Sequence, residues 1–300
     1  MKSGTVAALH LRLPATSANL GPGFDAVGLA MALYLTIDAV MAESFRIEAT
    51  GRNADLCSDV EHSLILTTYR EVLGGKGPAL HLTLHNEIPL GMGCGSSAAA
   101  LLAGVRLADH FGELGWTNQQ ILNEACRREG HPDNVAACWL GGMTCSAMVE
   151  GMAVTATFGL ALDWKIFVVL PSTSLATSEA RALLPSIYSR EDAVANVQST
   201  ALLVAAFAQG RGELLRTAMR DRLHQPYRME ACSLLPKLLL MGDEPEVLGV
   251  ALSGAGPSVL LVTRGVTEVE LFERRIRRYS APLEVEVVET TIANGCYRTS

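Results

Sequence analysis

The sequence predicts an α+β protein built in two halves, and three features of the chain lead to this expectation. Segments with apolar residues at every second position, typical of strands, are interspersed with segments of helical periodicity. Both kinds of segment occur before and after residue 155, and glycine-rich loops separate them. The 300 residues, 49% hydrophobic and 18% charged, suffice to bury a core in each half. We therefore expect two α+β domains, residues 1–155 and 156–300.

The N-terminal half is predicted to begin with strands and to continue with helices. Alternating apolar residues predict strands at 5–13, 26–42, 45–51 and 78–90. The Pro/Gly/Asn-rich stretch 14–25 is expected to be a loop. Helical periodicity predicts helices at 63–75, 96–111 and 117–129, the last with Thr117 as its N-cap, and a short helix that begins near Val135.

The C-terminal half is predicted to mix the same elements after a boundary near residues 150–160. Strands are expected at 142–150, 153–159, 165–171, 246–254, 257–265 and 283–292. Helices are expected at about 177–184, 190–209, 211–220, 230–241 and 268–279.

Composition excludes several classes of function. The chain carries 24 basic and 31 acidic residues, a net charge of −7, which argues against nucleic acid or an anionic membrane as partner. Only four lysines occur, so that any side-chain recognition of a carboxylate or phosphate depends on arginine. The seven cysteines form no C-x-x-C pair, and we find neither a signal peptide nor an apolar run long enough to span a membrane. We expect reduced thiols and a cytoplasmic protein.

Four polar or glycine-rich loops stand out from the apolar background. They are "PATSANLGPGFD" (14–25), "PLGMGCGSSAA" (89–99), "EGHPDN" (129–134) and "LSGAGPS" (252–258). Turn chemistry alone accounts for any one of them. Because each follows a strand or precedes a helix, we expect all four to meet in one cleft.

The stretch 89–99 predicts an anion site at the start of a helix. It is not a P-loop, which needs a lysine, nor a dinucleotide fingerprint, since position 96 is serine, and no G-x-S-x-G elbow occurs. Glycines let backbone N–H groups converge on a phosphate at a helix N-terminus, with the hydroxyls binding phosphate oxygens or magnesium. The alternative is a plain turn with Ser96 or Ser97 as the N-cap of a core helix.

Together these loops resemble the signature motifs of the GHMP kinases. "P-x-x-x-G-x-G-S-S-A-A" is similar to the ATP-binding motif of that superfamily, and "PATSANLGPGFDAVGLAM" resembles the first motif of its homoserine kinases in particular. "EGHPDNVAACWLGG" and "LSGAGPSVLLV" follow in the same order, so that the match covers residues 10–263. Cys94 stands where these kinases usually carry leucine, which we expect to be tolerated at the risk of a looser loop or an oxidised thiol.

The resemblance implies a two-domain GHMP kinase fold with the active site between the halves and with ATP and Mg²⁺ as cofactors. The ATP phosphates are expected along Pro89, Leu90, Gly91, Met92, Gly93, Cys94, Gly95, Ser96, Ser97, Ala98 and Ala99. The metal is expected on Glu129 and on one of the two serines; we take Ser97, although the sequence does not distinguish it from Ser96. A solvated carboxylate at a helix end is the alternative for Glu129.

The implied substrate is L-homoserine, whose hydroxyl would be phosphorylated on the way to threonine. Asp25, with Asn19 beside it, is expected to hold the ammonium, and Arg181 and Arg228 the carboxylate. Surface ion pairs are the alternative for both arginines.

The resemblance implies that Asn134 and Asp133 are the catalytic pair and that Asn134 also binds the substrate, where the family positions the hydroxyl that attacks ATP; either residue could instead cap the helix near Val135. Asn134 cannot act as a base, so catalysis is expected to rest on positioning and charge neutralisation, with Asp133 as base left open and a structural role favoured for His131. Two other functions stay open: another small-molecule GHMP kinase, and a nucleotide-binding sensor without turnover. A homodimer is the family expectation.

Overall fold

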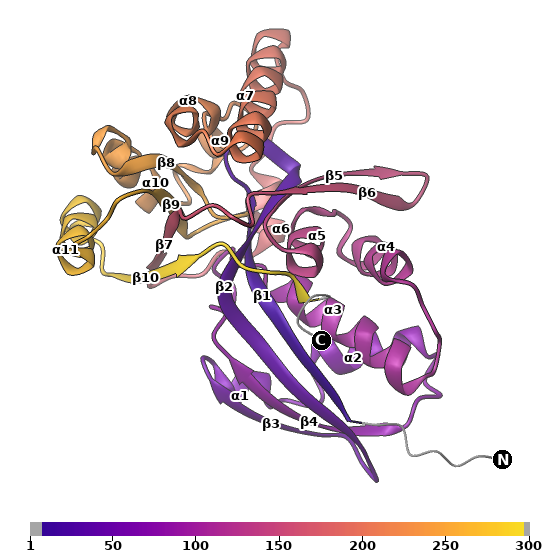
Figure 1. Ribbon diagram of the computed structural model, residues 1–300. Coiled ribbons are helices and arrows are strands. Elements are labelled where there is room, and N and C mark those ends of the chain that lie inside the picture. The colour runs from indigo at the N-terminus through magenta and orange to yellow at the C-terminus, as the bar shows by residue number, and fades with distance from the viewer. Residues whose placement is uncertain (1–7, 297–300) are drawn as a thin grey trace.

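The computed structural model describes residues 8–296, which form two β-sheets with helices packed on them (Figure 1). The strands are β1 Leu9–Asn19, β2 Gly23–Ala42, β3 Arg46–Gly51, β4 Ala79–Asn86, β5 Met143–Val149, β6 Met152–Phe158, β7 Lys165–Pro171, β8 Val247–Leu252, β9 Val259–Thr263 and β10 Val285–Thr291. The helices are α1 Ala54–Cys57, α2 Leu64–Val72, α3 Ser96–Phe111, α4 Asn118–Glu129, α5 Asp133–Leu140, α6 Thr177–Ala182, α7 Arg190–Gln209, α8 Leu215–Ala218, α9 Gln225–Arg228, α10 Leu234–Leu239 and α11 Val269–Ser280, with short 3₁₀ turns at Gly212–Leu214 and Leu240–Asp243.

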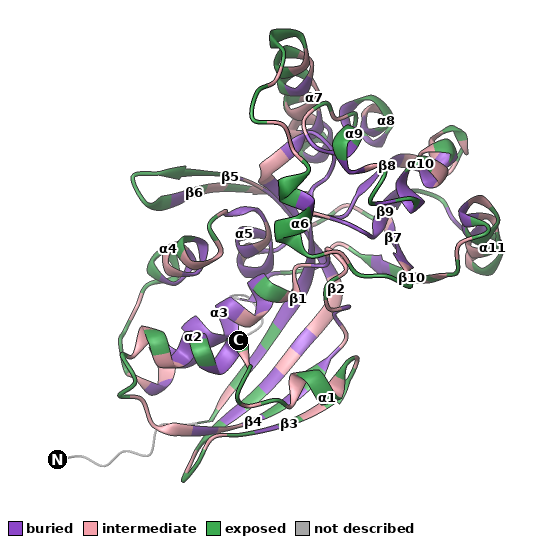
Figure 2. Cartoon of the chain, turned by 180° about the vertical axis from the view of Figure 1, so that it is seen from behind, coloured by how far each residue is buried: buried purple, intermediate pink, exposed green. Residues whose placement is uncertain are grey.

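The first sheet has the order β3-β4-β2-β5-β6, with β1 paired to β2. The long strand β2 is central, because it pairs with β1, β4 and β5 along different parts of its length. Helix α3 packs against α2, α4, α5 and β1, and its small apolar residues and leucines are buried there (Figure 2). This packing holds the N-terminus of α3 at one fixed place beside the first strands.

The second sheet has the order β10-β7-β9-β8. Helices α10 and α11 bury Leu235, Leu238, Phe272 and Ile276 in a core that they share with its strands. The chain passes from the first sheet to the second between Phe158 and Lys165. The predicted domain boundary between residues 155 and 156 falls inside β6, and the division into domains stays a prediction.

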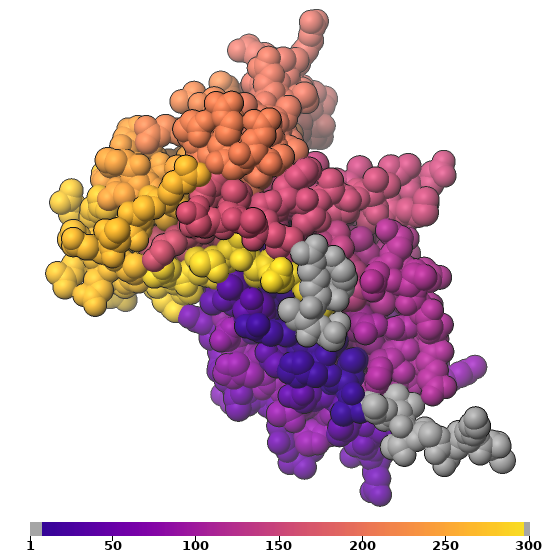
Figure 3. Space-filling model, in the orientation of Figure 1, coloured from indigo at the N-terminus to yellow at the C-terminus, as the bar shows by residue number. Residues whose placement is uncertain are grey.

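The C-terminal segment returns to the first half of the molecule. After β10, Ile292 forms a bridge to Met31 of β2, and Asn294 forms a bridge to Gly141 at the end of α5. In Figure 3 this yellow segment lies between the indigo strands and the later part of the chain. The two halves are therefore joined by a second crossing of the chain, which the sequence did not predict.

Most predicted elements are present, with three corrections. The stretch 14–25 is not mainly a loop: β1 continues to Asn19 and β2 starts at Gly23, because small side chains such as Ala15 and Thr16 are fully buried in the paired strands. The helices predicted at 211–220 and 230–241 are broken into shorter turns. Helices α1 and α9 were missed, since four residues are too few to show a periodicity.

Residues 5–7 of the first predicted strand lie outside the described residues. Among the helices of residues 8–296, none is both long enough and apolar enough to cross a membrane.

Candidate active site

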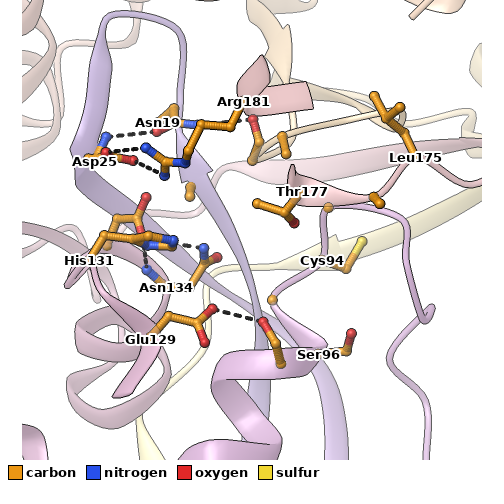
Figure 4. A pocket seen from close by; sticks show the side chains of 18 of the residues that line it. Asn19, Asp25, Cys94, Ser96, Glu129, His131, Asn134, Leu175, Thr177 and Arg181 are labelled. Carbon is orange, nitrogen blue, oxygen red and sulfur yellow. Dashed lines mark hydrogen bonds and ion pairs between the residues drawn. The ribbon is translucent and has the colours of Figure 1, made fainter. Parts of the chain in front are cut away.

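One pocket of about 200 Å³ brings the four predicted loops together (Figure 4). Its lining includes residues of all four loops: Asn19 and Asp25; Gly91 and residues 93–97; Glu129, His131, Asp133 and Asn134; and Gly254 with Ala255. The expectation of a shared cleft is confirmed. The segment from Leu175 to Arg181 and the side chain of Arg228 complete the wall, which therefore combines residues of both halves of the chain.

The glycine loop is shaped by close backbone contacts. Gly91, Gly93 and Gly95 all have φ near +70°, the left-handed region. A Cβ atom on Gly93 would lie 2.1 Å from the carbonyl oxygen of Ser253, and one on Gly95 would lie 1.8 Å from Oγ1 of Thr16. Glycine is required at both positions because other parts of the site occupy the space of a side chain.

Helix α3 starts at Ser96, and its N-cap residue is Gly95. The interpretation of Ser96 or Ser97 as the N-cap is therefore wrong, since both serines lie in the first helical turn and neither hydroxyl caps the helix. The first N–H groups of a helix have no acceptor within it, and they carry the positive end of the helix dipole. The start of α3 therefore offers the pocket N–H groups and two hydroxyls, which suits a phosphate group.

Gly91→Ala is expected to raise KM for ATP about tenfold and to leave the fold intact. At Gly91 an added Cβ would only touch Cβ of Ser174, at 3.4 Å, so that the cost arises from forcing alanine into φ +70°. Gly74→Ala is the matched control, because Gly74 has φ +58° and open space around it and is not part of the pocket lining. Steady-state kinetics and thermal melts of both variants separate an effect on the loop geometry from an effect on stability. An equal KM for ATP in the two variants contradicts the assignment of the glycine loop to the ATP phosphates.

Ser97 and Glu129 meet at the edge of the glycine loop. Oγ of Ser97 donates a hydrogen bond of 2.8 Å to Oε1 of Glu129, and the two residues come from the start of α3 and the end of α4. Burial raises the pKa of the Glu129 carboxyl, an effect that the Ser97 hydrogen bond and His131 partly offset. A carboxylate and a hydroxyl at this distance offer a hard cation the oxygen ligands that it prefers.

Several hydrogen bonds converge on the carboxylate of Asp133 at the start of α5. Its side chain is 2% exposed, and Oδ1 lies 2.6 Å from Nδ1 of His131 and accepts from the backbone N–H of Asn134 at 2.6 Å and from its Nδ2 at 3.3 Å. The hydrogen bond to Asp133 raises the pKa of His131. Pro132 is the N-cap of α5, so that the capping alternative for Asp133 and Asn134 is wrong.

Gly28 places this helix start against the first sheet. A Cβ atom on Gly28 would lie 2.1 Å from the carbonyl oxygen of Asp133, so that only glycine allows β2 and α5 to approach this closely. The sequence analysis missed Gly28, although a glycine inside a predicted strand is a known sign of close backbone contact.

Asp25 and Arg181 lie side by side in the wall of the pocket and form an ion pair (Figure 4). Two hydrogen bonds of 2.9 Å join the guanidinium to the carboxylate, and they raise the pKa of Arg181. The backbone N–H of Asp25 donates to Oδ1 of Asn19, whose Nδ2 in turn donates to the carbonyl of Gly254. Arg181 therefore forms an ion pair, as the alternative hypothesis for this residue predicted. The pair lies in the pocket wall and joins α6 to the first two strands.

Arg228 is a buried cation without a carboxylate partner in residues 8–296. It is 2% exposed, and its guanidinium bonds to the carbonyl of Ala180 at 3.1 Å, to Nδ1 of His224 at 3.0 Å and to the carbonyl of Gly254 at 3.4 Å. Burial lowers its pKa. The surface ion pair is therefore wrong for Arg228, and a buried charge supported only by dipoles favours an incoming anion.

The side chain of His224, which was not among the predicted site residues, contacts the guanidinium of Arg228 and holds it in place. Because the guanidinium only donates, Nδ1 of His224 must accept, and its Nε2–H then donates to the carbonyl of Gly21 at 2.8 Å. Burial lowers the pKa of His224, which agrees with this neutral form.

Cys94 is buried at the back of the glycine loop. Burial raises the pKa of its thiol to about 12, and Sγ lies 3.8 Å from the carbonyl oxygen of Met92. Oxidation proceeds through the thiolate, so that this environment protects the thiol. The departure from leucine is thus accommodated as a small apolar side chain.

Comparison with known proteins places this site in a family. Family models of the GHMP kinases match residues 63–142 (N terminal domain) and 203–281 (C terminal). A homoserine kinase of Solibacter usitatus is 48% identical over 275 residues, covering 89% of this chain and 90% of that protein. The structure of a homoserine kinase from Cytophaga hutchinsonii superposes with a TM-score of 0.78 at 22% identity, over 98% of this chain and 97% of that one.

The fold alone extends further. The structure of an L. major mevalonate kinase reaches a TM-score of 0.76 at 13% identity over 97% of this chain and 98% of that chain. Shared fold therefore does not distinguish acceptors, whereas sequence identity across nearly the whole length does. The chain belongs to the homoserine kinase family of the GHMP kinases, and it is an ATP-using phosphotransferase.

Proposed function

We propose that the protein transfers the γ-phosphoryl group of ATP, bound with Mg²⁺, to the side-chain hydroxyl of L-homoserine. The observation that carries this proposal is the charge pattern of the pocket. A carboxylate and two guanidinium groups, Asp25, Arg181 and Arg228, lie at one end, and the glycine loop with Ser97 and Glu129 lies at the other. The name of the relative from Solibacter usitatus supports the same substrate.

The Asp25–Arg181 pair matches a zwitterion. The carboxylate of Asp25 satisfies the fork of Arg181 in two hydrogen bonds, the geometry that a substrate carboxylate would adopt. An α-amino acid can insert its own carboxylate at Arg181 and Arg228 and give its ammonium to Asp25. Each charged group then contacts an opposite charge, because the two guanidinium groups share the substrate carboxylate, whereas an uncharged alcohol such as a sugar would break the ion pair without replacing it.

The nucleotide would occupy two adjoining pockets. Its phosphates fit the N–H groups at the start of α3, and the base fits a neighbouring pocket of about 310 Å³. That pocket shares Ser96 and Ser97 with the substrate pocket and is lined mainly by apolar side chains such as Leu56, Leu64 and Ile88. Ser97 and Glu129 would hold Mg²⁺ through their oxygens, and the bound ion would supply charge neutralisation at the phosphates.

Catalysis would rest on positioning. The amide of Asn134 can donate to the acceptor hydroxyl and direct the hydroxyl oxygen toward the γ-phosphorus, and the positive end of the α3 dipole would stabilise negative charge on the transferred group. Three hydrogen bonds already engage Oδ1 of Asp133, which favours a role in holding His131 and Asn134 over that of a base.

A coupled assay of ADP release tests the proposal with L-homoserine, mevalonate, galactose and shikimate as acceptors. We expect kcat/KM for L-homoserine to exceed that for each other alcohol by at least 100-fold. Equal or faster turnover of an alcohol without an amino-acid group contradicts the substrate, and ATP binding without turnover of any acceptor supports the sensor.

A further inference from the structure

Thr16 links the glycine loop to Asn134. It lies in β1 and is fully buried. Its hydroxyl donates a hydrogen bond of 2.7 Å to Oδ1 of Asn134, and its backbone N–H donates one of 3.0 Å to the carbonyl of Cys94. One residue of the first strand therefore holds both the loop assigned to the phosphates and the side chain assigned to the acceptor hydroxyl.

The hydrogen bonds determine which way the Asn134 amide is turned. Oδ1 of Asp133 is an acceptor, so that the group of Asn134 at 3.3 Å from it must be the NH₂ group. The amide oxygen consequently faces Thr16, which donates to it. With the oxygen engaged, the second N–H of the amide is the donor left for an acceptor hydroxyl.

The glycine loop packs directly on the same hydroxyl. A Cβ atom on Gly95 would lie 1.8 Å from Oγ1 of Thr16 and 3.1 Å from Oδ1 of Asn134, so the loop backbone, the hydroxyl and the amide are in contact. Moving the Asn134 amide therefore means moving it relative to a fixed N-terminus of α3. In-line phosphoryl transfer depends on that relative placement, and an error of about 1 Å costs on the order of 100-fold in rate.

We propose that Thr16 is a positioning residue, which orients the Asn134 amide and sets its distance to the phosphate loop. The inference rests on the proposed function, because it requires Asn134 to contact the acceptor. It assigns to Thr16 no contact with ATP, metal or substrate.

The test compares Thr16→Val with Thr16→Ser. Valine has nearly the shape of threonine but no hydroxyl, whereas serine keeps the hydroxyl and loses a methyl group. We expect Thr16→Val to lower kcat about 10- to 100-fold with both KM values within threefold of wild type, and Thr16→Ser to restore most of kcat. Thr263→Val is the matched control, since Thr263 is a fully buried strand threonine whose hydroxyl bonds to the carbonyl of Lys165 away from the pocket lining.

A double-mutant cycle with Asn134→Ala separates this inference from the proposed function. If Thr16 acts through Asn134, Thr16→Val causes no further loss of kcat in the Asn134→Ala background. Multiplied losses, or a kcat within twofold of wild type for Thr16→Val alone, overturn the inference while Asn134 keeps its role. An unchanged kcat for Asn134→Ala overturns the role of Asn134 and the inference with it. Melting temperatures show whether a loss of kcat in Thr16→Val follows from unfolding. If it does, the kcat values of Thr16→Ser and Thr263→Val decide whether the inference holds.

Discussion

Glu129→Gln is expected to lower kcat by at least about 100-fold, the largest loss among the substitutions considered. Glutamine has the shape of glutamate and can still accept the hydrogen bond from Oγ of Ser97, so that the local structure is retained. It lacks the negative charge that a divalent cation requires. Losing several kcal/mol of charge stabilisation in the transition state corresponds to a factor of 100 or more. The measurement is kcat as a function of Mg²⁺ concentration, with the midpoint expected at higher Mg²⁺.

The two adjacent serines provide the matched control for this site. Ser97→Ala should shift the Mg²⁺ midpoint in the same direction as Glu129→Gln, because Ser97 is the serine that reaches Glu129. Ser96→Ala should shift it far less, and neither variant removes a helix cap, since Gly95 holds that position. An unchanged Mg²⁺ midpoint in Glu129→Gln returns Glu129 to a solvated carboxylate, and a larger effect of Ser96→Ala assigns the metal to that serine.

Arg228→Lys is expected to raise KM for L-homoserine by about 10- to 150-fold with KM for ATP within threefold of wild type. A lysine keeps the charge but cannot bond to Ala180, His224 and Gly254 and still present a planar fork to a carboxylate. Losing a charge-assisted hydrogen bond costs about 1.5–3 kcal/mol, which corresponds to this range. Steady-state kinetics with each substrate varied in turn gives both KM values.

Arg222→Lys is the control for the loss of an arginine from the same segment. Arg222 is 59% exposed in its side chain and pairs with Asp192 at 3.4 Å, outside the pocket lining, so that both KM values should stay within twofold of wild type. If Arg228→Lys behaves like Arg222→Lys, Arg228 does not bind the substrate carboxylate and serves only to hold α6 and the loop 252–258 together.

Much of the fold could be predicted from the sequence because its elements are long and periodic. Helix α3 spans residues 96–111 as expected, and Thr117 caps α4 with a capping box to Gln120. The stretch 14–25 was misjudged for the opposite reason. Its two prolines, two glycines and one asparagine are typical of a loop, yet burial of Ala15, Thr16 and Ala18 against β2 and the helices behind it outweighs that local preference.

The sequence by itself determined which loops carry glycine, hydroxyl, carboxylate and guanidinium groups, and in what order these loops follow one another along the chain. These groups are properties of single residues and of short motifs, so that they can be read without a structure. Only the tertiary structure decided which of these groups are in contact. Ser97 rather than Ser96 meets Glu129, Asp25 pairs with Arg181, Arg228 is buried without a counterion among residues 8–296, and Thr16 reaches Asn134 over 118 positions. The physical reason is that these contacts depend on how the two sheets pack against the N-termini of α3 and α5. They also depend on Gly28, Gly93 and Gly95, which let backbone segments approach closely. Neither the packing nor the close approach leaves a periodic pattern in the sequence.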